Sequence, residues 1–256
     1  AFLISAPFLI SKIDINFEKY IWGVLIIVSL INTAGIIYLA KAFRHLKISV
    51  ASPLMGFEPV FVVFLSFIFL KESISNTQLV GLLLILIGGY ILEIKKEAFN
   101  LFQPIKEAIN SKYIRYGLIS IFLYSFSSLI SRYVINPENG SGLNVYTYYI
   151  FVRFFVAIFL LILLSILYDG IQGVKNGVKN MGWLLLPASA LSVIHGLLTL
   201  SAFAIPTANA GLVLAVKRIS IFFETLIGGE LFHDDNIILK LVSSLFMMLG
   251  AYLVII

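Results

Sequence analysis

The feature that most limits the fold is a series of long apolar segments, each about 18–24 residues long. As a helix, a segment of this length covers roughly 27–36 Å, which matches the hydrocarbon core of a bilayer. Strands of a membrane barrel would be shorter and would alternate polar with apolar residues, which these segments do not. We therefore predict an all-α, polytopic transmembrane helical bundle. The eight segments are residues 20–42, 48–70, 77–94, 113–134, 145–168, 181–203, 207–229 and 236–256.

The composition excludes a water-soluble domain of this length. Charged residues make up 12% of the chain and hydrophobic residues 60%, whereas soluble domains carry about 25% charged residues. So few charges could not cover a soluble surface. The net charge of +5 then indicates basic loops beside a membrane rather than nucleic-acid binding. The absence of cysteine excludes disulfides, thiolate metal sites and a cysteine nucleophile.

The shorter stretches between these segments carry three further predictions. Residues 1–11 are apolar but too short to span, and we interpret them as the remainder of a helix cut by truncation. The longest connection, residues 95–112, is predicted to hold a short interfacial amphipathic helix broken at Pro104. Residues 169–179 contain three glycines and are predicted to form a turn.

The two halves of the chain share an ordered set of short matches. An Ala-Phe helix end, a glutamate after the next helix and a glycine-tyrosine pair recur in the same order. They lie at 42–43 and 202–203, at 72 and 230, and at 88–90 and 250–252. Internal duplication is typical of secondary transporters. We predict two five-helix repeats, inverted because five is odd: residues 1–94 form an incomplete first repeat, 95–112 the connection and 113–256 the second repeat.

Several short motifs then point to one family. In the first half they occupy residues 51–53, 58–61, 69–72, 78–81 and 88–89, and in the second half 228–230 and 250. With these motifs the chain resembles the EamA-like transporters of the drug/metabolite transporter superfamily. The resemblance implies ten helices in two repeats and the transport of small metabolites, with no particular substrate. The second half departs from the pattern at 215–220, which reads AVKRIS where the first half has Glu58-Pro59.

Six polar or charged residues lie well inside the apolar segments, where an uncompensated charge is costly. We predict that they form the substrate-binding site. In the repeat alignment, Glu58 and Lys217 occupy corresponding depths in corresponding helices, so inverted symmetry would bring them together at the midplane. The six residues are Glu58, Arg153, His195, Lys217, Arg218 and Glu224.

Two readings of these charges stay open. In the first, Glu58 and Lys217 form a buried ion pair that fixes helix register. In the second, they line a cavity in which three cations, Arg153, Lys217 and Arg218, outnumber the two carboxylates. A surplus cation favours an anionic substrate such as an organic acid or a phosphorylated compound. A desolvated lysine can also titrate, so Lys217 could couple proton movement.

Other polar residues receive structural interpretations. His195 is more often a hydrogen-bonded helix contact than a proton carrier. Asn32 is predicted to form an interhelical hydrogen bond, and Asn209 either the same or a helix cap. Glu72 and Glu230 each end a helix and are predicted to cap the start of the helix that follows.

No enzyme motif is present. The chain has no Gly-x-Ser-x-Gly elbow, no HExxH and no phosphate-binding loop, so we predict no enzyme, no cofactor and no metal. The expected partners are a small-molecule substrate and the lipid bilayer, with a proton or counter-substrate as the candidate coupling partner, and no nucleic acid. A carrier acting by alternating access is favoured. A membrane channel or a non-transporting scaffold stay as alternatives.

Membrane orientation is predicted from the basic residues of alternating connections. One side holds 11 Lys and Arg and the other holds 4, namely Lys12, Lys19, Lys71 and Arg132. The positive-inside rule then places residues 95–112 in the cytoplasm, whereas the arrangement implied by the resemblance places them outside. The predicted location is the cell membrane, as a multi-pass protein.

Overall fold

The structure, a computed structural model, describes most of the chain. The described residues are 2–45, 58–93, 111–138, 140–167 and 170–217, together with 242, 245–247, 249–250 and 252–253. The predicted interfacial helix at 95–112 therefore lies outside the described residues except for its last two positions. Arg218, Glu224 and Glu230 also lie outside the described residues.

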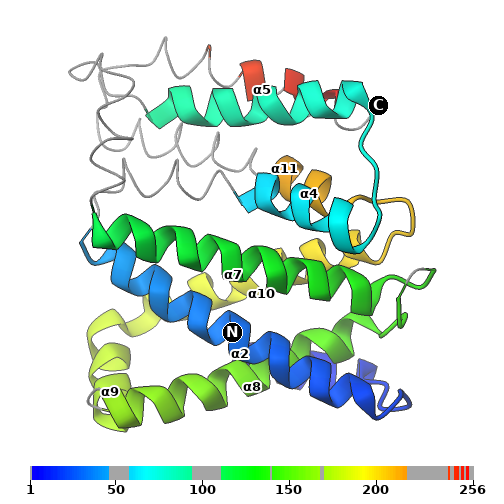
Figure 1. The fold of residues 1–256 in the computed structure, drawn as a ribbon. Helices are drawn as coiled ribbons and strands as arrows, with labels where there is room; N and C mark the ends of the chain where they lie inside the picture. Colours follow the sequence, from blue (N-terminus) through cyan, green and yellow to red (C-terminus); the bar gives the residue numbers. More distant parts are fainter. Residues whose placement is uncertain are drawn as a thin grey trace. The chain divides into compact units, whose positions relative to one another are not determined.

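Helices account for most of the described residues, and no strand occurs among them (Figure 1). The predicted helical class is confirmed. Two short 3₁₀ turns, Ile10–Lys12 and Gly182–Leu184, separate some of the helices. The α-helices are α1 Phe2–Leu9, α2 Tyr20–Phe43, α4 Glu58–Phe69, α5 Asn76–Glu93, α7 Lys112–Ile135, α8 Val145–Leu167, α9 Gly170–Met181, α10 Leu185–Phe203 and α11 Ala210–Lys217.

Four of the helical stretches are long and apolar enough to cross a membrane. They are α2, α7, α8 and the stretch Gly170–Phe203. Large apolar side chains stay exposed along them, such as Leu191 and Leu198 at 67% each. In lipid such exposure carries no penalty, because a helix satisfies its own backbone groups and its apolar surface faces hydrocarbon. The chain is an all-α, multi-pass membrane protein.

The described chain divides into two compact units that do not follow the two sequence halves. Unit 1 comprises residues 1–34 and 127–208, and unit 2 comprises 35–126 and 209–256. Each unit therefore combines segments from both halves of the chain. The boundary falls inside α2 and inside α7, so each of these helices begins in one unit and ends in the other.

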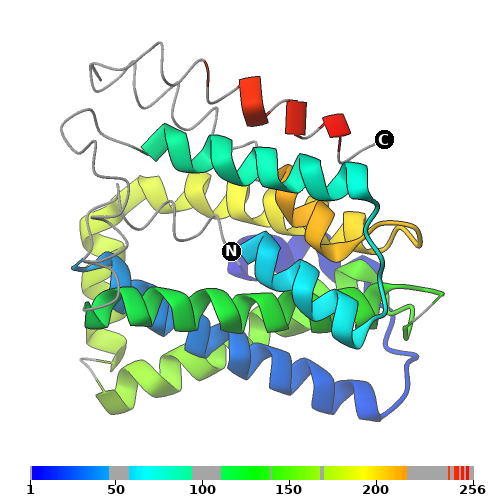
Figure 2. The same cartoon turned by 45° about the horizontal axis from the view of Figure 1, so that its top comes forward.

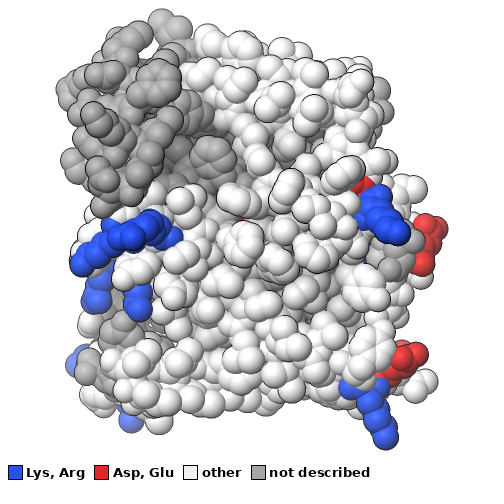
Figure 3. Space-filling model, viewed as in Figure 1, with Lys and Arg blue, Asp and Glu red and all other residues white. Residues whose placement is uncertain are grey.

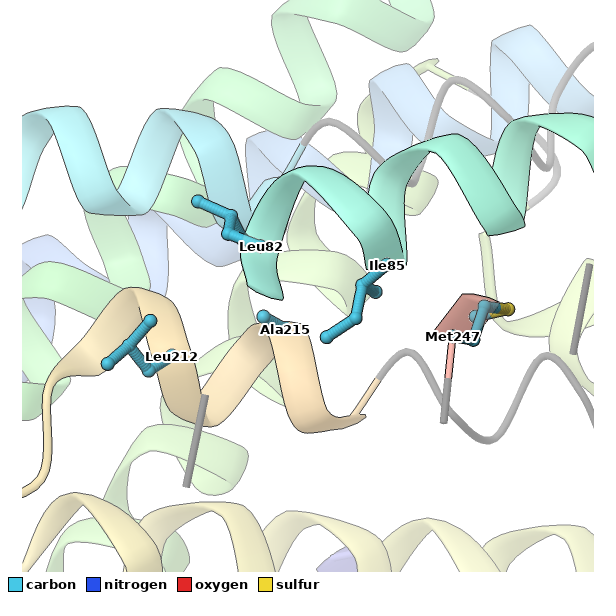
Figure 4. Packing of buried hydrophobic residues seen from close by; sticks show 5 residues of the cluster. All are labelled: Leu82, Ile85, Leu212, Ala215 and Met247. Atoms are coloured by element: carbon cyan, nitrogen blue, oxygen red, sulfur yellow. The ribbon is translucent and has the colours of Figure 1, made fainter. Parts of the chain in front are cut away.

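Unit 2 has a core built from helices of both halves. Leu82 and Ile85 of α5 pack with Leu212 and Ala215 of α11 and with Met247 (Figure 4). All five are buried. In Figure 2, α11 lies between α4 and α5, and it contacts both. Helices that the sequence assigned to different repeats thus share one apolar core.

Unit 1 is held by polar as well as apolar contacts. Leu9 of α1 packs with Tyr149 and Ile150 of α8. The amide nitrogen of Asn32 on α2 donates to the hydroxyl of Ser127 on α7 at 2.7 Å. This hydrogen bond confirms the predicted interhelical role of Asn32. Polar contacts of this kind join helices where the surroundings are apolar.

The predicted turn at 169–179 is wrong, because Gly170–Met181 forms helix α9. Gly170 has φ 53°, a left-handed value that glycine adopts at little cost, and it redirects the chain after α8. Four apolar side chains then recur every three or four residues on one exposed face, which is the pattern of an interfacial amphipathic helix. They are Ile171, Val174, Val178 and Met181. This spacing outweighs the low helix propensity of the glycines. A 3₁₀ turn follows, so α10 begins at Leu185 rather than at the predicted residue 181.

Candidate functional site

The described part of the candidate site in unit 2 rests on the packing of α4 against α11, which run antiparallel. Helix α4 ends at Phe69. Three residues later, a carboxylate oxygen of Glu72 accepts a hydrogen bond from the backbone N–H of Ala210, the first residue of α11, at 3.0 Å. The end of α4 therefore lies beside the start of α11. The two helices lie next to each other in both Figure 1 and Figure 2.

A glycine sets how closely the two helices approach. A Cβ atom added at Gly211 would lie 3.0 Å from the Cα of Val63 and would collide with the Val63 side chain. The backbones of α11 and α4 thus meet at these two residues. Small residues at a crossing are what allow helices to pack this closely in membranes.

The same crossing places two predicted site residues at one depth. Glu58 precedes Val63 by five residues, and Lys217 follows Gly211 by six. Because the helices run antiparallel, both displacements go in the same direction. Measured along the axes of the two helices, Glu58 and Lys217 differ in height by the rise of one residue, roughly 1.5 Å. Glu58 and Lys217 therefore lie at nearly the same level on adjacent helices, as the repeat alignment predicted.

Glu58 lies in tightly packed surroundings. It is 7% exposed. Next to it, the hydroxyl of Ser125 on α7 donates to the Glu58 backbone carbonyl at 3.4 Å. The ring of Phe61 packs edge-on against that of Phe122 on α7. A carboxylate so placed is costly unless something compensates it, and Glu58 and Lys217 each take part in further interactions within the chain.

A second group of site residues lies in unit 1, between α8 and α10. The guanidinium of Arg153 lies over the ring of Tyr149, one turn earlier on α8, at 5.3 Å from the ring centroid. A Cβ added at Gly196 of α10 would lie 2.7 Å from the Tyr149 ring and 3.5 Å from a terminal nitrogen of Arg153. Gly196 thus provides the room for both side chains. A cation over an aromatic face is attracted by the negative face of the ring.

Tyr149 is a candidate site residue that sequence reasoning missed. Its side chain is 2% exposed, and its hydroxyl has no hydrogen-bond partner among the described residues. Buried polar atoms are nearly always paired, so an unpaired one requires an explanation. Its position four residues before Arg153, on the same helix face, is the sequence signal that could have identified it. Together, the guanidinium and the hydroxyl offer donors suited to an anionic group.

His195 is placed differently from its neighbour Gly196. Its side chain is exposed, and its backbone carbonyl accepts a hydrogen bond from the Thr199 hydroxyl at 2.9 Å. Successive helix positions are about 100° apart, so Gly196 can face α8 while His195 does not. The structure therefore places Glu58 and Lys217 at nearly the same level on adjacent helices in unit 2, and brings Arg153 close to α10 in unit 1. Among the described residues, no cluster of His, Asp and Glu could hold a metal ion.

The predicted role of Glu72 needs a correction. Through the hydrogen bond from Ala210, Glu72 caps α11, whereas α5 is the next helix along the chain. Helix α5 has its own capping box, in which Ser75 and Gln78 each accept a hydrogen bond from the backbone N–H of the other. Glu72 therefore joins the two halves of the chain. Its carboxylate also lies where the partial positive charge of the α11 N-terminus favours it.

Asn209 completes the cap of α11. Its side-chain oxygen accepts hydrogen bonds from the N–H groups of Gly211 at 2.9 Å and of Leu212 at 3.4 Å. Of the two roles left open for Asn209, the helix cap is confirmed. The first three backbone N–H groups of α11 are thus satisfied by Glu72 and Asn209, which fixes the start of the helix that carries Lys217.

Arg132 is buried, although the sequence assigned it to a connection outside the membrane. It is 2% exposed and donates to the carbonyl oxygens of Phe203, Ile205 and Pro206, with the last two bonds at 2.8 Å. These carbonyls belong to the end of α10 and the residues after it, where helix carbonyls lack intrahelical partners. One guanidinium thus satisfies the C-terminal end of α10.

Comparison with known proteins identifies the first part of the chain. Residues 1–93 match the EamA-like transporter family, which confirms the resemblance for the motifs of the first half of the chain. The match covers α1, α2, α4 and α5, and therefore includes Glu58 and Glu72. No curated protein matches the chain.

Proposed function

Because residues 1–93 match the EamA-like transporter family, we propose that this membrane protein carries a small anionic metabolite by alternating access. It is a transporter of the drug/metabolite type rather than an enzyme. The proposal assigns substrate binding to Glu58, Arg153, His195 and Lys217, with Arg218 and Glu224. It also assigns the protein to the cell membrane and gives it two inverted five-helix repeats.

One observation carries the proposal. Glu58 and Lys217 come from helices that match in the repeat alignment, and α4 and α11 pack antiparallel with these two residues at nearly the same level. Transporters with inverted repeats bind substrate at the interface of such matched, symmetry-related helices. A lysine and a glutamate at one depth in an otherwise apolar pair support a polar substrate site there.

The proposed preference for an anionic substrate rests on the cationic side chains of Arg153 and Lys217. Arg153 lies beside the buried Tyr149 hydroxyl, which has no hydrogen-bond partner among the described residues, and Lys217 ends the described part of α11. A charge at membrane depth costs roughly 2.5–3.5 kcal/mol or more on insertion scales, so such cations have a function or a partner. Guanidinium and ammonium groups bind carboxylates and phosphates through charge-assisted hydrogen bonds.

Uptake into proteoliposomes tests the proposal. The purified protein is offered panels of anionic, neutral and cationic metabolites, with and without a proton gradient, and with and without substrate trapped inside. We expect saturable uptake of an anion that is accelerated by the gradient or by internal substrate. Flux that rises linearly with concentration at a high rate would indicate a channel instead. Absence of flux for every class would indicate a scaffold.

A further inference from the structure

A group of basic and aromatic side chains lies where α2 ends and α7 begins, within unit 2. In Figure 3 a group of Lys and Arg side chains lies at the left edge, at this end of the two helices, with no Asp or Glu colour beside it. We call this group the basic–aromatic cluster. It contains the tyrosines Tyr38, Tyr113 and Tyr116 and the basic residues Lys41, Arg44, His45, Lys112 and Arg115.

Aromatic contacts fix the cluster across the two helices. Tyr38 of α2 packs against Tyr116 of α7 at a centroid distance of 5.7 Å. The ammonium of Lys41 lies near both rings, at 5.8 and 5.9 Å from their centroids. His45 stacks on Tyr113 at 4.2 Å. Half-buried tyrosines at the end of membrane helices are typical of the headgroup level of a bilayer.

The cations of the cluster lack carboxylate partners within the described chain. Lys41, Arg44, Lys112 and Arg115 are all exposed, and none of them forms an ion pair with a described residue. Residues 38–45 and 111–122 contain no Asp or Glu. The cluster therefore presents a local positive charge to whatever surrounds this end of the helices.

An apolar stripe on α7 continues from the cluster toward the middle of the helix. Arg115 is followed at spacings of three, four and seven residues by Leu118, Ile119 and Phe122, which are 41%, 41% and 45% exposed. Residues so spaced share one helix face. The stripe reaches roughly 10 Å from Arg115 along the helix axis. A cationic end joined to an apolar face of this length matches a molecule with an anionic head and hydrocarbon chains.

We propose that the basic–aromatic cluster is a binding site for an anionic phospholipid. Its phosphate and further negative charge lie among the four exposed cations, and its acyl chains lie along Leu118, Ile119 and Phe122. A soluble phosphate compound would use the cations and leave the stripe unused, whereas the tyrosines and the stripe both suit a lipid. The site is separate from the residues assigned to substrate, so it stands or falls independently of transport.

Native mass spectrometry of the full-length protein tests the lipid site. The protein is equilibrated in mixed micelles with equal amounts of phosphatidylglycerol and phosphatidylcholine, and the bound lipids are counted. We expect retained phosphatidylglycerol in the unmodified protein. Each basic residue near a membrane surface contributes about fivefold in affinity for anionic lipid, so Lys41→Gln with Lys112→Gln should weaken retention about 25-fold.

Lys12→Gln with Lys19→Gln is the matched control. It also removes two exposed lysines, one of which lies 4.8 Å from the Tyr146 ring centroid, but Asp14 and Glu18 lie between them in the sequence. This control should retain phosphatidylglycerol. Arg44→Gln with Arg115→Gln leaves the tyrosine contacts intact and should show the same loss as the lysine pair. Equal loss in the control, no loss in either cluster variant, or displacement of the lipid by inorganic phosphate alone would overturn the proposal.

Discussion

The α4–α11 pair and the α8–α10 pair both carry candidate site residues and both have a glycine where the helices meet, but the two glycines contact different atoms. Gly211 of α11 meets the backbone Cα of Val63 as well as its side chain. Gly196 of α10 meets the ring edge of Tyr149 and the end of Arg153. A backbone contact can give way only if a helix moves, whereas a ring and a guanidinium can turn about their own bonds.

The comparison implies different roles for the two pairs. In unit 2, the crossing at Gly211 and the cap from Glu72 fix α11 against α4, so the depths of Glu58 and Lys217 are set by the backbone. In unit 1, Arg153 is held mainly by a ring contact and can reorient. We infer that Glu58 and Lys217 lie on a rigid helix pair in unit 2, and that Arg153 of unit 1 is an adjustable cation. Four stability predictions and one transport prediction probe this difference.

The largest loss of stability is expected on replacing Arg132, whose buried guanidinium caps the C-terminal end of α10. Arg132→Leu removes the side-chain donor of three carbonyl groups, of which that of Ile205 also accepts from the Ala208 N–H at 3.1 Å. An unsatisfied buried polar group costs about 1–3 kcal/mol, so we expect a loss of about 3 kcal/mol or more, measured by chemical unfolding in detergent. Arg132→Lys should recover part of the loss, because an ammonium donates from one point and cannot span the same fork.

Arg44→Leu is the control for Arg132, because it removes an exposed arginine from a helix end. It should change the unfolding free energy by less than about 0.5 kcal/mol. If Arg132→Leu were equally mild, the three carbonyls would be satisfied by other means, and the account of the end of α10 would be wrong.

Gly211→Ala should have the next largest effect. The new methyl group meets the Val63 backbone, so α4 and α11 must separate. Overpacking of this kind costs about 1–3 kcal/mol. Thermal unfolding should show the decrease, and uptake should fall with it. At Gly23 of α2 an added Cβ meets nothing within 4 Å, so Gly23→Ala should be neutral or slightly stabilising.

Glu72→Ala should destabilise the start of α11 by about 1 kcal/mol, within the range for lost helix caps. Glu72→Gln keeps a hydrogen-bond acceptor for the Ala210 N–H and should lose less than the alanine variant. The difference between them in unfolding free energy measures the hydrogen bond to Ala210. Equal losses in the two variants would mean that the carboxylate charge, rather than this hydrogen bond, stabilises α11.

The smallest of the stability effects is expected at Gly196. A methyl group there meets the Tyr149 ring edge and the end of Arg153, both of which can shift. We expect Gly196→Ala to cost less than about 1 kcal/mol, and clearly less than Gly211→Ala, in the same unfolding assay. A larger loss at Gly196 than at Gly211 would reverse the proposed division into rigid and adjustable pairs.

The sequence predicted where the helices lie better than it predicted which helices contact each other. Apolar length alone located α2, α7 and α8 to within a residue or two, because the bilayer demands a fixed helix length. Helix α9 was not predicted, because its three glycines indicated a turn. The helical spacing of its four apolar residues was the opposing signal. The matched depth of Glu58 and Lys217 followed from the repeat alignment, which needs no tertiary detail.

Long-range capping could not be predicted from the sequence. Glu72 was expected to act on the next helix, and it acts on Ala210, 138 residues away. Arg132 was counted among the loop cations, and it is buried against the end of α10. In both cases the residue type indicated a helix-end role, but only the packing of distant helices decides which end it meets. Tyr149 likewise became a candidate only when its hydroxyl proved unpaired among the described residues.

The most direct test of the central claim is the uptake rate of the Lys217→Met variant, alone and combined with Glu58→Gln, in proteoliposomes. Lys179→Met, which removes an exposed lysine of α9, is the control and should transport normally. If Lys217 binds the substrate, Lys217→Met remains folded and inserted but loses transport, and adding Glu58→Gln does not restore it. Transport restored in the double variant would contradict the claim and leave a register-fixing ion pair as the role of both residues.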